Sequence, residues 1–113
     1  RQHHLALRAG IEAMGLRFLV REDARLPQLN AIVMPAGVDE AQLRARLLNN
    51  YDLEIGAGLG ALAGKIVRIG LMGHTSNMKN VFYCLNALEA VLAEMHVQIE
   101  QGVAVHAAQR ALA

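Results

Sequence analysis

The chain has 113 residues, of which 54% are apolar, and a formal net charge of +1. This length fits one compact domain, and a near-neutral charge with dispersed basic residues argues against a nucleic-acid surface. Because no apolar run reaches the roughly 18 residues that a membrane-spanning helix requires, the sequence predicts neither nucleic acid nor a membrane as a partner.

The first predicted element is a helix that is already under way where the chain opens. Gly15 supplies its C-cap, but no N-cap residue precedes it and the first residue is arginine. Since no signal-peptide pattern is present either, we expect a chain cut from a longer protein, with apolar surface left open near His4, Leu7 and Ile11. The stripe of this helix consists of His4, Leu7, Ile11 and Met14.

Two strands and a second helix come next. Residues 16–20 (LRFLV) and 29–34 have the composition of strands, with a charged turn between them and a Pro-Ala-Gly stop behind them. Asp39 is a suitable N-cap, with a glutamine at the position that completes a box-like start. The helix that it begins is expected to run to about Asn50.

Residues 51–73 (YDLEIGAGLGALAGKIVRIGLMG) predict a short strand, a glycine-rich loop and a second strand. Alternation along the second strand places Arg68 on one face with Ile66, Gly70 and Met72. A guanidinium on a mostly apolar face is costly unless it meets an anion, and a carboxylate or phosphate suits its planar fork. A solvated strand residue or an internal salt bridge would explain the same pattern, so the residues alone leave these readings open.

The glycine loop has three interpretations. Gly58-x-Gly60-x-x-Ala63 matches a dinucleotide fingerprint, but a strand is predicted to follow it where the fingerprint needs a helix. Gly64-Lys65 resembles a phosphate-binding loop, yet the Ser or Thr that would hold magnesium is absent. We therefore interpret the segment as a wide, flexible hairpin connection.

Other chemistry-bearing residues give weak signals. The five histidines lack acidic or cysteine companions at metal-ligand spacing, so no metal site is predicted. Cys84, the single cysteine, excludes an internal disulfide, fits a reducing compartment and is expected to be a small buried hydrophobe.

The last part of the chain is helical. Thr75 or Ser76 is the expected N-cap of a long helix, and Gly102 separates that helix from a final piece over residues 103–113. The complete order of elements predicts an α+β fold, a small, mainly antiparallel sheet covered by helices. The long helix carries an apolar stripe of Val81, Leu85, Leu88, Leu92 and Met95.

The run LEIGAGLGALAGKIVRIGLMG, followed by HTSNMKNV and a long helix, resembles the C-terminal region of class V aminotransferases. The resemblance extends over about residues 16–95 and is strongest to the alanine–glyoxylate and serine–glyoxylate (serine–pyruvate) aminotransferases. One departure is Ala57, which interrupts the family's run of glycines and makes the loop stiffer. The matching residues are 32–37 (IVMPAG), 54–60 (EIGAGLG), 64–65, 68–70, 73 and 80–81.

This resemblance implies a fold-type-I pyridoxal-phosphate enzyme with a large cofactor-binding domain and a smaller C-terminal domain. Residues 1–15 would then be the remnant of an inter-domain helix, and residues 16–113 the C-terminal small domain. By the same resemblance, Arg68 binds the α-carboxylate of the substrate, and Gly58, Leu59 and Gly60 form a loop near that site.

The resemblance further implies that the parent protein moves an amino group from alanine or serine to glyoxylate or pyruvate through pyridoxal 5'-phosphate. Its partners would be small amino and keto acids, its own large domain and a second subunit of a homodimer, in the cytoplasm, or in peroxisomes for some relatives. In the family the Schiff-base lysine and the cofactor-binding groups lie upstream, and Lys65 belongs to the carboxylate-side motif. We therefore expect the fragment alone to hold no cofactor and to be inactive.

The residues also leave room for a stand-alone α+β module that binds a ligand or serves oligomerisation without catalysis.

Overall fold

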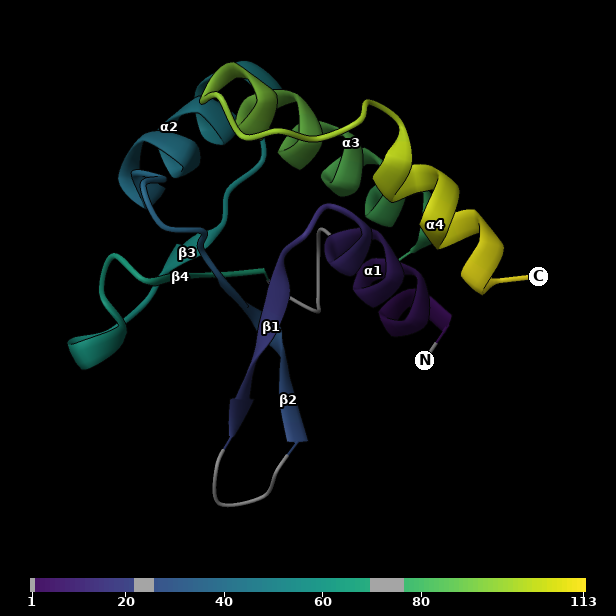
Figure 1. Cartoon of the computed structure of the whole chain (residues 1–113), viewed down its shortest axis with the longest axis horizontal. Coiled ribbons are helices and arrows are strands. Elements are labelled where there is room, and N and C mark those ends of the chain that lie inside the picture. The colour runs from purple at the N-terminus through teal and green to yellow at the C-terminus, as the bar shows by residue number, and fades with distance from the viewer. Residues whose placement is uncertain (1, 22–25, 70–76) are drawn as a thin grey trace.

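The computed structural model describes residues 2–21, 26–69 and 77–113 of the chain. Helices and short strands are arranged as an α+β fold, as the sequence predicts (Figure 1). In chain order the elements are α1 (Gln2–Ala13), β1 (Arg17–Arg21), β2 (Leu26–Val33), α2 (Glu40–Tyr51), β3 (Gly56–Ala57), the single 3₁₀ turn η1 (Gly60–Leu62), β4 (Ile66–Arg68), α3 (Met78–Glu94) and α4 (Val103–Ala111).

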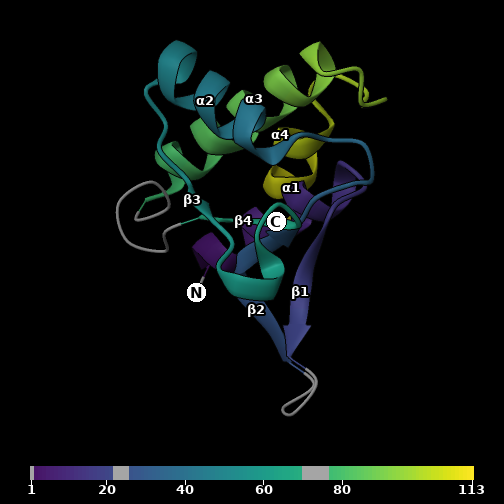
Figure 2. The same ribbon diagram turned by 90° about the vertical axis from the view of Figure 1, so that its left-hand side faces the viewer.

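The strands form one four-stranded sheet in the order β1-β2-β4-β3. Each of the three strand pairs in this order is antiparallel, which confirms the predicted sheet type. The β1–β2 hairpin extends away from the helices (Figure 2). β3 and β4 are the two arms of a second hairpin, and η1 lies at its turn.

The two faces of the sheet differ in character. Ile32 on β2 is paired with Phe18 on β1 and Val67 on β4, and these three side chains are buried in the main core. Residues on the other face are offset by one position, as alternation requires, and include Ala31 and its partner Arg68. The α-helices of the described residues lie over the first face, and none of them covers the second, which we call the uncovered face (Figures 1 and 2).

α3 is the central helix of the core. It begins at Asn77, whose side-chain Oδ1 accepts a hydrogen bond from the backbone N–H of Asn80 at 2.9 Å. The predicted cap, Thr75 or Ser76, is therefore wrong, and those two residues lie outside the described part of the chain. The predicted apolar stripe is buried as expected: Val81, Leu85, Leu88 and Leu92 are 0% exposed, and Met95 is half-buried.

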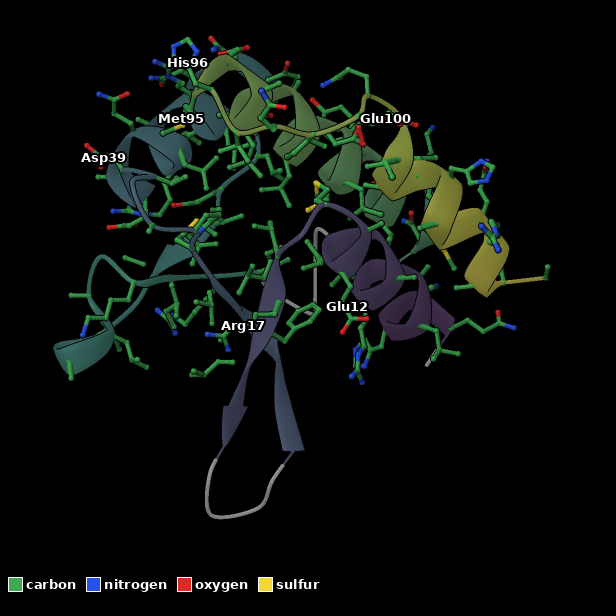
Figure 3. The ribbon with its side chains drawn as sticks, in the orientation of Figure 1. Glu12, Arg17, Asp39, Met95, His96 and Glu100 are labelled. Carbon is green, nitrogen blue, oxygen red and sulfur yellow. The ribbon has the colours of Figure 1, made fainter. Side chains whose placement is uncertain are left out.

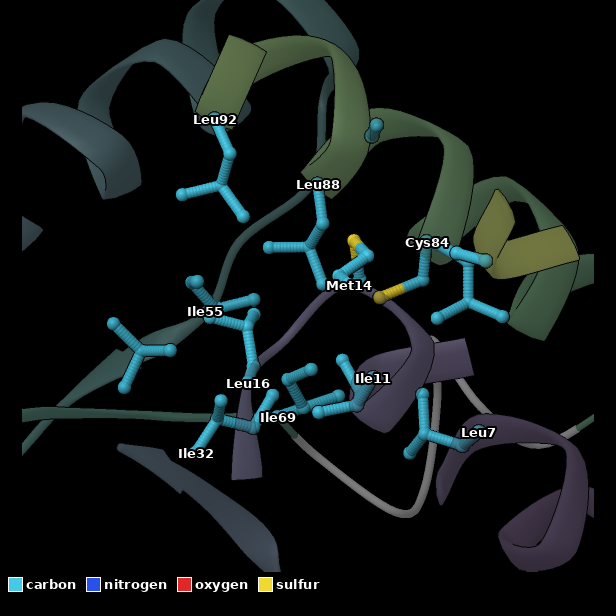
Figure 4. Close-up of a cluster of buried hydrophobic side chains, with 14 of the residues drawn as sticks. Leu7, Ile11, Met14, Leu16, Ile32, Ile55, Ile69, Cys84, Leu88 and Leu92 are labelled. Atoms are coloured by element: carbon cyan, nitrogen blue, oxygen red, sulfur yellow. The ribbon is translucent and has the colours of Figure 1, made fainter. Parts of the chain in front are cut away.

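α1 packs against α3 and α4 and closes one side of the core (Figure 4). Its backbone comes so close that a Cβ at Gly10 would lie 2.5 Å from Cδ1 of Leu85. Leu7 and Ile11 are 1% and 0% exposed. The expected open apolar surface near these two residues is therefore wrong, because α3 and α4 supply the cover that we assigned to a missing domain.

The remaining helix ends show how side chains satisfy backbone groups. The Asp39 carboxylate begins α2, as predicted, by accepting hydrogen bonds from the N–H groups of Ala41 and Gln42 at 3.0 and 3.3 Å. α4 begins after Gly102, which has a φ of 88° and no side chain to serve as a cap. None of the described helices is long and apolar enough to cross a membrane.

Glu89 of α3 supplies the missing cap of α4. Its carboxylate oxygens accept hydrogen bonds from the N–H groups of Gly102 at 2.6 Å and Ala104 at 3.0 Å. Glu89 is only 1% exposed, and the N-terminal amides of a helix are well suited to a buried negative charge. A carboxylate from one helix thus fixes the start of the next.

Candidate anion-binding site at Arg68

Arg68 is the last residue of β4 and lies on the sheet face that no helix covers. It is paired with Ala31 on β2 and with Gly56 on β3, and its side chain is exposed. Ile66, on the same face, is buried because the β3–β4 turn folds back over it. Gly70 and Met72, which were expected to share this face, lie outside the described residues.

The side chain of Arg68 is held in place across β3. Its Nε donates a hydrogen bond to the backbone carbonyl of Ala57 at 2.9 Å. Gly56 lies beside the guanidinium, where a Cβ would be 3.4 Å from Nη2 and 3.6 Å from Cζ. These are ordinary contact distances, so the guanidinium lies against the backbone of β3, with its two Nη groups not engaged by the described residues.

Three other arginines of the described chain form ion pairs with acids, whereas Arg68 does not. Nitrogen–oxygen distances of 3.1, 2.6 and 3.3 Å join Arg8 to Glu12, Arg44 to Glu40, and Arg46 to Glu94. No carboxylate of the described part pairs with Arg68. An internal salt bridge among these residues is thus not the explanation of this arginine, and a fixed cation remains that is able to receive an anion.

The glycine loop is more tightly built than the wide, flexible connection that we predicted. The N–H of Leu62 donates to the carbonyl of Leu59 at 3.0 Å, and the N–H of Lys65 donates to that of Leu62 at 3.0 Å. At Gly58 a Cβ would lie 2.4 Å from the carbonyl oxygen of Leu62 and 2.7 Å from Cγ1 of Ile66. The glycine therefore permits the turn to pack on its own strand.

The three predicted loop residues have different surroundings. Gly58 is buried next to β3, whereas Leu59 is 71% exposed and Gly60 has a φ of 57°. β4 follows the loop, so neither a dinucleotide fingerprint nor a phosphate-binding loop has the helix that it requires.

Arg17 is another arginine that has no ion pair among the described residues, and the sequence reasoning missed it. It lies on the edge strand β1, opposite Val33 (Figure 3). By alternation it shares the sheet face of Arg68, which is two strands away on β4. The hydrogen bond to Ala57 directs the Arg68 side chain toward β3, which is the side of β4 away from β2 and β1. Alternation with the apolar residues of β1 was the signal that could have found Arg17.

The described residues offer no reactive cysteine and no metal cluster near this site. Cys84 is fully buried in the core, as predicted, and burial raises the pKa of its thiol to about 12, so the thiol is inert at neutral pH. In residues 2–21, 26–69 and 77–113, no group of three His, Cys, Asp or Glu side chains could hold a metal ion.

Comparison with known proteins gives relatives along almost the entire chain, although no family model matches it. The (S)-ureidoglycine–glyoxylate transaminase of Bacillus subtilis is 43% identical over 108 residues, which are 96% of this chain and 26% of the relative. The alanine–glyoxylate aminotransferase of Drosophila melanogaster is 36% identical over 95 residues, or 83% of this chain and 24% of the relative.

The solved structures agree with these relatives. The crystal structure of ureidoglycine–glyoxylate aminotransferase from Bacillus subtilis matches with a TM-score of 0.87 and 39% identity. The match covers 99% of this chain and 29% of that protein. The chain thus spans about a quarter of the length of the curated relatives that it matches.

Proposed function

This chain belongs to the class V aminotransferases over the quarter of their length that it matches, and from that premise we propose that it is the C-terminal small domain of such an enzyme. Residues 16–113 form this domain, and residues 1–15 are the end of the helix that joins it to the large domain. The full-length protein, a cytoplasmic homodimer, transfers an amino group from alanine or serine to glyoxylate or pyruvate. The names of two relatives support glyoxylate as the acceptor.

The part of the reaction that this chain performs is recognition of the substrate carboxylate by Arg68. The observation that carries this proposal is a guanidinium held by the Ala57 carbonyl at 2.9 Å and left without an acid partner in the described chain. Amino donors and keto acceptors both carry a carboxylate next to the reacting carbon. One fixed arginine can therefore orient both substrates in turn.

Coverage by the rest of the full-length protein would strengthen this interaction. Arg68 is exposed in this chain, where water screens its charge. In the full-length protein, the large domain and the partner subunit would cover the sheet face of Arg68 and exclude water from it. The ion pair between Arg68 and a substrate carboxylate would then be stronger. The exposed Leu59 and its neighbours Gly58 and Gly60 supply an apolar loop beside that space.

Pyridoxal 5'-phosphate is the cofactor that an aminotransferase of this class requires, and we propose that its site lies outside the described residues of this chain. The sequence contains two lysines, Lys65 and Lys79. Both are exposed, one on the β3–β4 turn and the other in the first turn of α3. Neither lies in an enclosed site in which a Schiff base would form, so we place the cofactor site in the part of the relatives' length that this chain does not match.

The test is substitution of Arg68 in the full-length protein. Arg68→Ala should lower kcat/KM for alanine and glyoxylate by about a hundredfold, because a charge-assisted, two-pronged contact is worth about 3 kcal/mol when water is excluded. Arg68→Lys should recover only part of this, since an ammonium lacks the planar fork. Arg110→Ala is the matched control, because Arg110 is an exposed arginine at the end of α4.

Steady-state kinetics with alanine or serine as donor and glyoxylate or pyruvate as acceptor would measure these effects. Wild-type kcat/KM in the Arg68→Ala enzyme would refute the role of Arg68. Absence of transaminase activity from the wild-type full-length protein would instead favour a ligand-binding or oligomerisation module.

A further inference from the structure

We infer that the β3–β4 hairpin selects which edge of the Arg68 guanidinium receives the substrate carboxylate, an inference that rests on the proposed function. A guanidinium can pair with a carboxylate in two planar ways. It uses either Nε with one Nη, from the side, or both Nη groups, from the end. The two arrangements place the substrate in different positions relative to the strand, so the choice between them orients the reacting carbon.

The Ala57 carbonyl excludes the side arrangement. Nε carries a single hydrogen, and that hydrogen is donated to the Ala57 oxygen at 2.9 Å. A carboxylate that approached Nε would have to displace a carbonyl oxygen that the sheet pairing holds in place. The end formed by Nη1 and Nη2 keeps four N–H donors, which is enough to bind both oxygens of a carboxylate.

Gly58 holds the Ala57 carbonyl in its position. It follows Ala57 directly, and its missing side chain allows the turn to pack against the Leu62 carbonyl and Ile66. A methyl group at residue 58 would stand 2.4 Å from the Leu62 oxygen, a distance that forces the backbone to move. Because the carbonyl of Ala57 and the N–H of Gly58 share one peptide plane, that movement also shifts the partner of Nε. Gly58 is thus a positioning residue for Arg68.

The same geometry explains why lysine is a poor substitute at residue 68. Arginine uses one nitrogen to fix itself to the hairpin and two others to bind the ligand. A lysine ammonium is a single group on a flexible stem. It cannot donate a hydrogen bond to the Ala57 carbonyl and at the same time bind both oxygens of a carboxylate.

Nitrogen NMR of the arginine side chains in the full-length protein tests this inference, with acetate and glyoxylate as carboxylate probes and Arg68→Lys for assignment. We expect the Arg68 Nε–H to exchange with solvent about tenfold more slowly than that of exposed Arg110, the factor that one net hydrogen bond provides. Added carboxylate should move the Arg68 Nη signals and leave the Nε–H bonded.

Three results would count against these claims, and they are distinguishable. A shift and faster exchange of Nε–H on adding carboxylate would mean side-on binding and would overturn this inference while Arg68 remained the carboxylate residue. Rapid Nε–H exchange before any addition would overturn the role of Ala57. If no Arg68 signal responds to carboxylate, the proposed function itself fails.

A variant pair gives a second, kinetic test. Gly58→Ala should raise KM for glyoxylate and for the amino donor by about tenfold, because misplacement of the guanidinium weakens carboxylate binding. Ala61→Ser, a change of similar size at an exposed residue of the same turn, should leave KM unchanged. Unaltered KM and unaltered Nε–H exchange in Gly58→Ala would overturn the positioning role. The NMR test uses the native hairpin, so it remains decisive if Gly58→Ala fails to fold.

Discussion

Removal of the Glu89 carboxylate should destabilise the chain through α4. In Glu89→Ala the buried N–H of Ala104 loses its acceptor, which costs about 1–3 kcal/mol. Gly102 is exposed, so its N–H can hydrogen-bond to water when Glu89 is removed. Its hydrogen bond to the Glu89 carboxylate, at 2.6 Å, therefore contributes less to stability. The sum is about 2.5 kcal/mol, or a fall in Tm of roughly 10 °C for a chain of this size.

Glu89→Gln separates the charge from the shape. A glutamine keeps one carbonyl oxygen as an acceptor but turns an NH2 group toward the second backbone N–H. We therefore expect a loss of about half that of the alanine variant. Glu94→Ala on the same helix is the control, because its ion pair with Arg46 is about half exposed and such pairs contribute about 0.5 kcal/mol.

Urea unfolding followed by circular dichroism would give the free energies, and amide hydrogen exchange would report the two bonds directly. The N–H groups of Gly102 and Ala104 should lose protection in Glu89→Ala, while those in the middle of α3 keep it. If Glu89→Ala unfolds within about 0.5 kcal/mol of the wild type and the Ala104 amide stays protected, the carboxylate does not hold α4 and the reasoning is wrong.

Four further outcomes follow from the described contacts. Gly10→Ala should cost about 1–3 kcal/mol in urea unfolding, since its Cβ would stand 2.5 Å from Leu85 and α1 would have to move; an unchanged midpoint would contradict the close approach. The Cys84 thiol should react with a thiol reagent only after unfolding at neutral pH, and fast reaction in the folded state would disprove its burial. Burial raises the pKa of the Cys84 thiol from 9 to about 12. The stability that the buried neutral thiol contributes is therefore fully present below pH 9 and is lost as the pH rises from 9 to about 12. Comparison of the unfolding free energies of Cys84→Ala and the wild type across this pH range would measure the loss. Arg68→Ala in this chain should change Tm little, since the exposed guanidinium makes one hydrogen bond, whereas a cooperative collapse would identify a structural residue.

Local patterns predicted the elements well where one periodicity dominated. The stripe of α3 repeats at helical spacing over four turns, and Leu85, Leu88 and Leu92 are all fully buried. Asp39 stands alone as a cap candidate before α2 and was identified correctly. The arginine on an apolar strand was also visible, because alternation alone set Arg68 apart from the core side of β4.

Features that depend on tertiary contacts were not predictable in this way. Thr75, Ser76 and Asn77 are three consecutive residues able to cap a helix, and local propensity does not choose among them. The burial of α1 depends on α3 and α4, which are remote from it in sequence. Glu89 did carry a signal: it follows Leu85 by four residues, so a carboxylate stood on the buried stripe and required a partner.

The packing of α1 on α4 has a consequence for how this chain is made. These helices are the first and the last described elements, so residues separated by almost the whole sequence contact each other. During synthesis, α1 emerges from the ribosome long before α4 exists, so Leu7 and Ile11 wait without their final cover. The chain must also close its longest loop before this contact forms. We therefore expect α1 to be the helix that most needs chaperone protection until α4 has been synthesised.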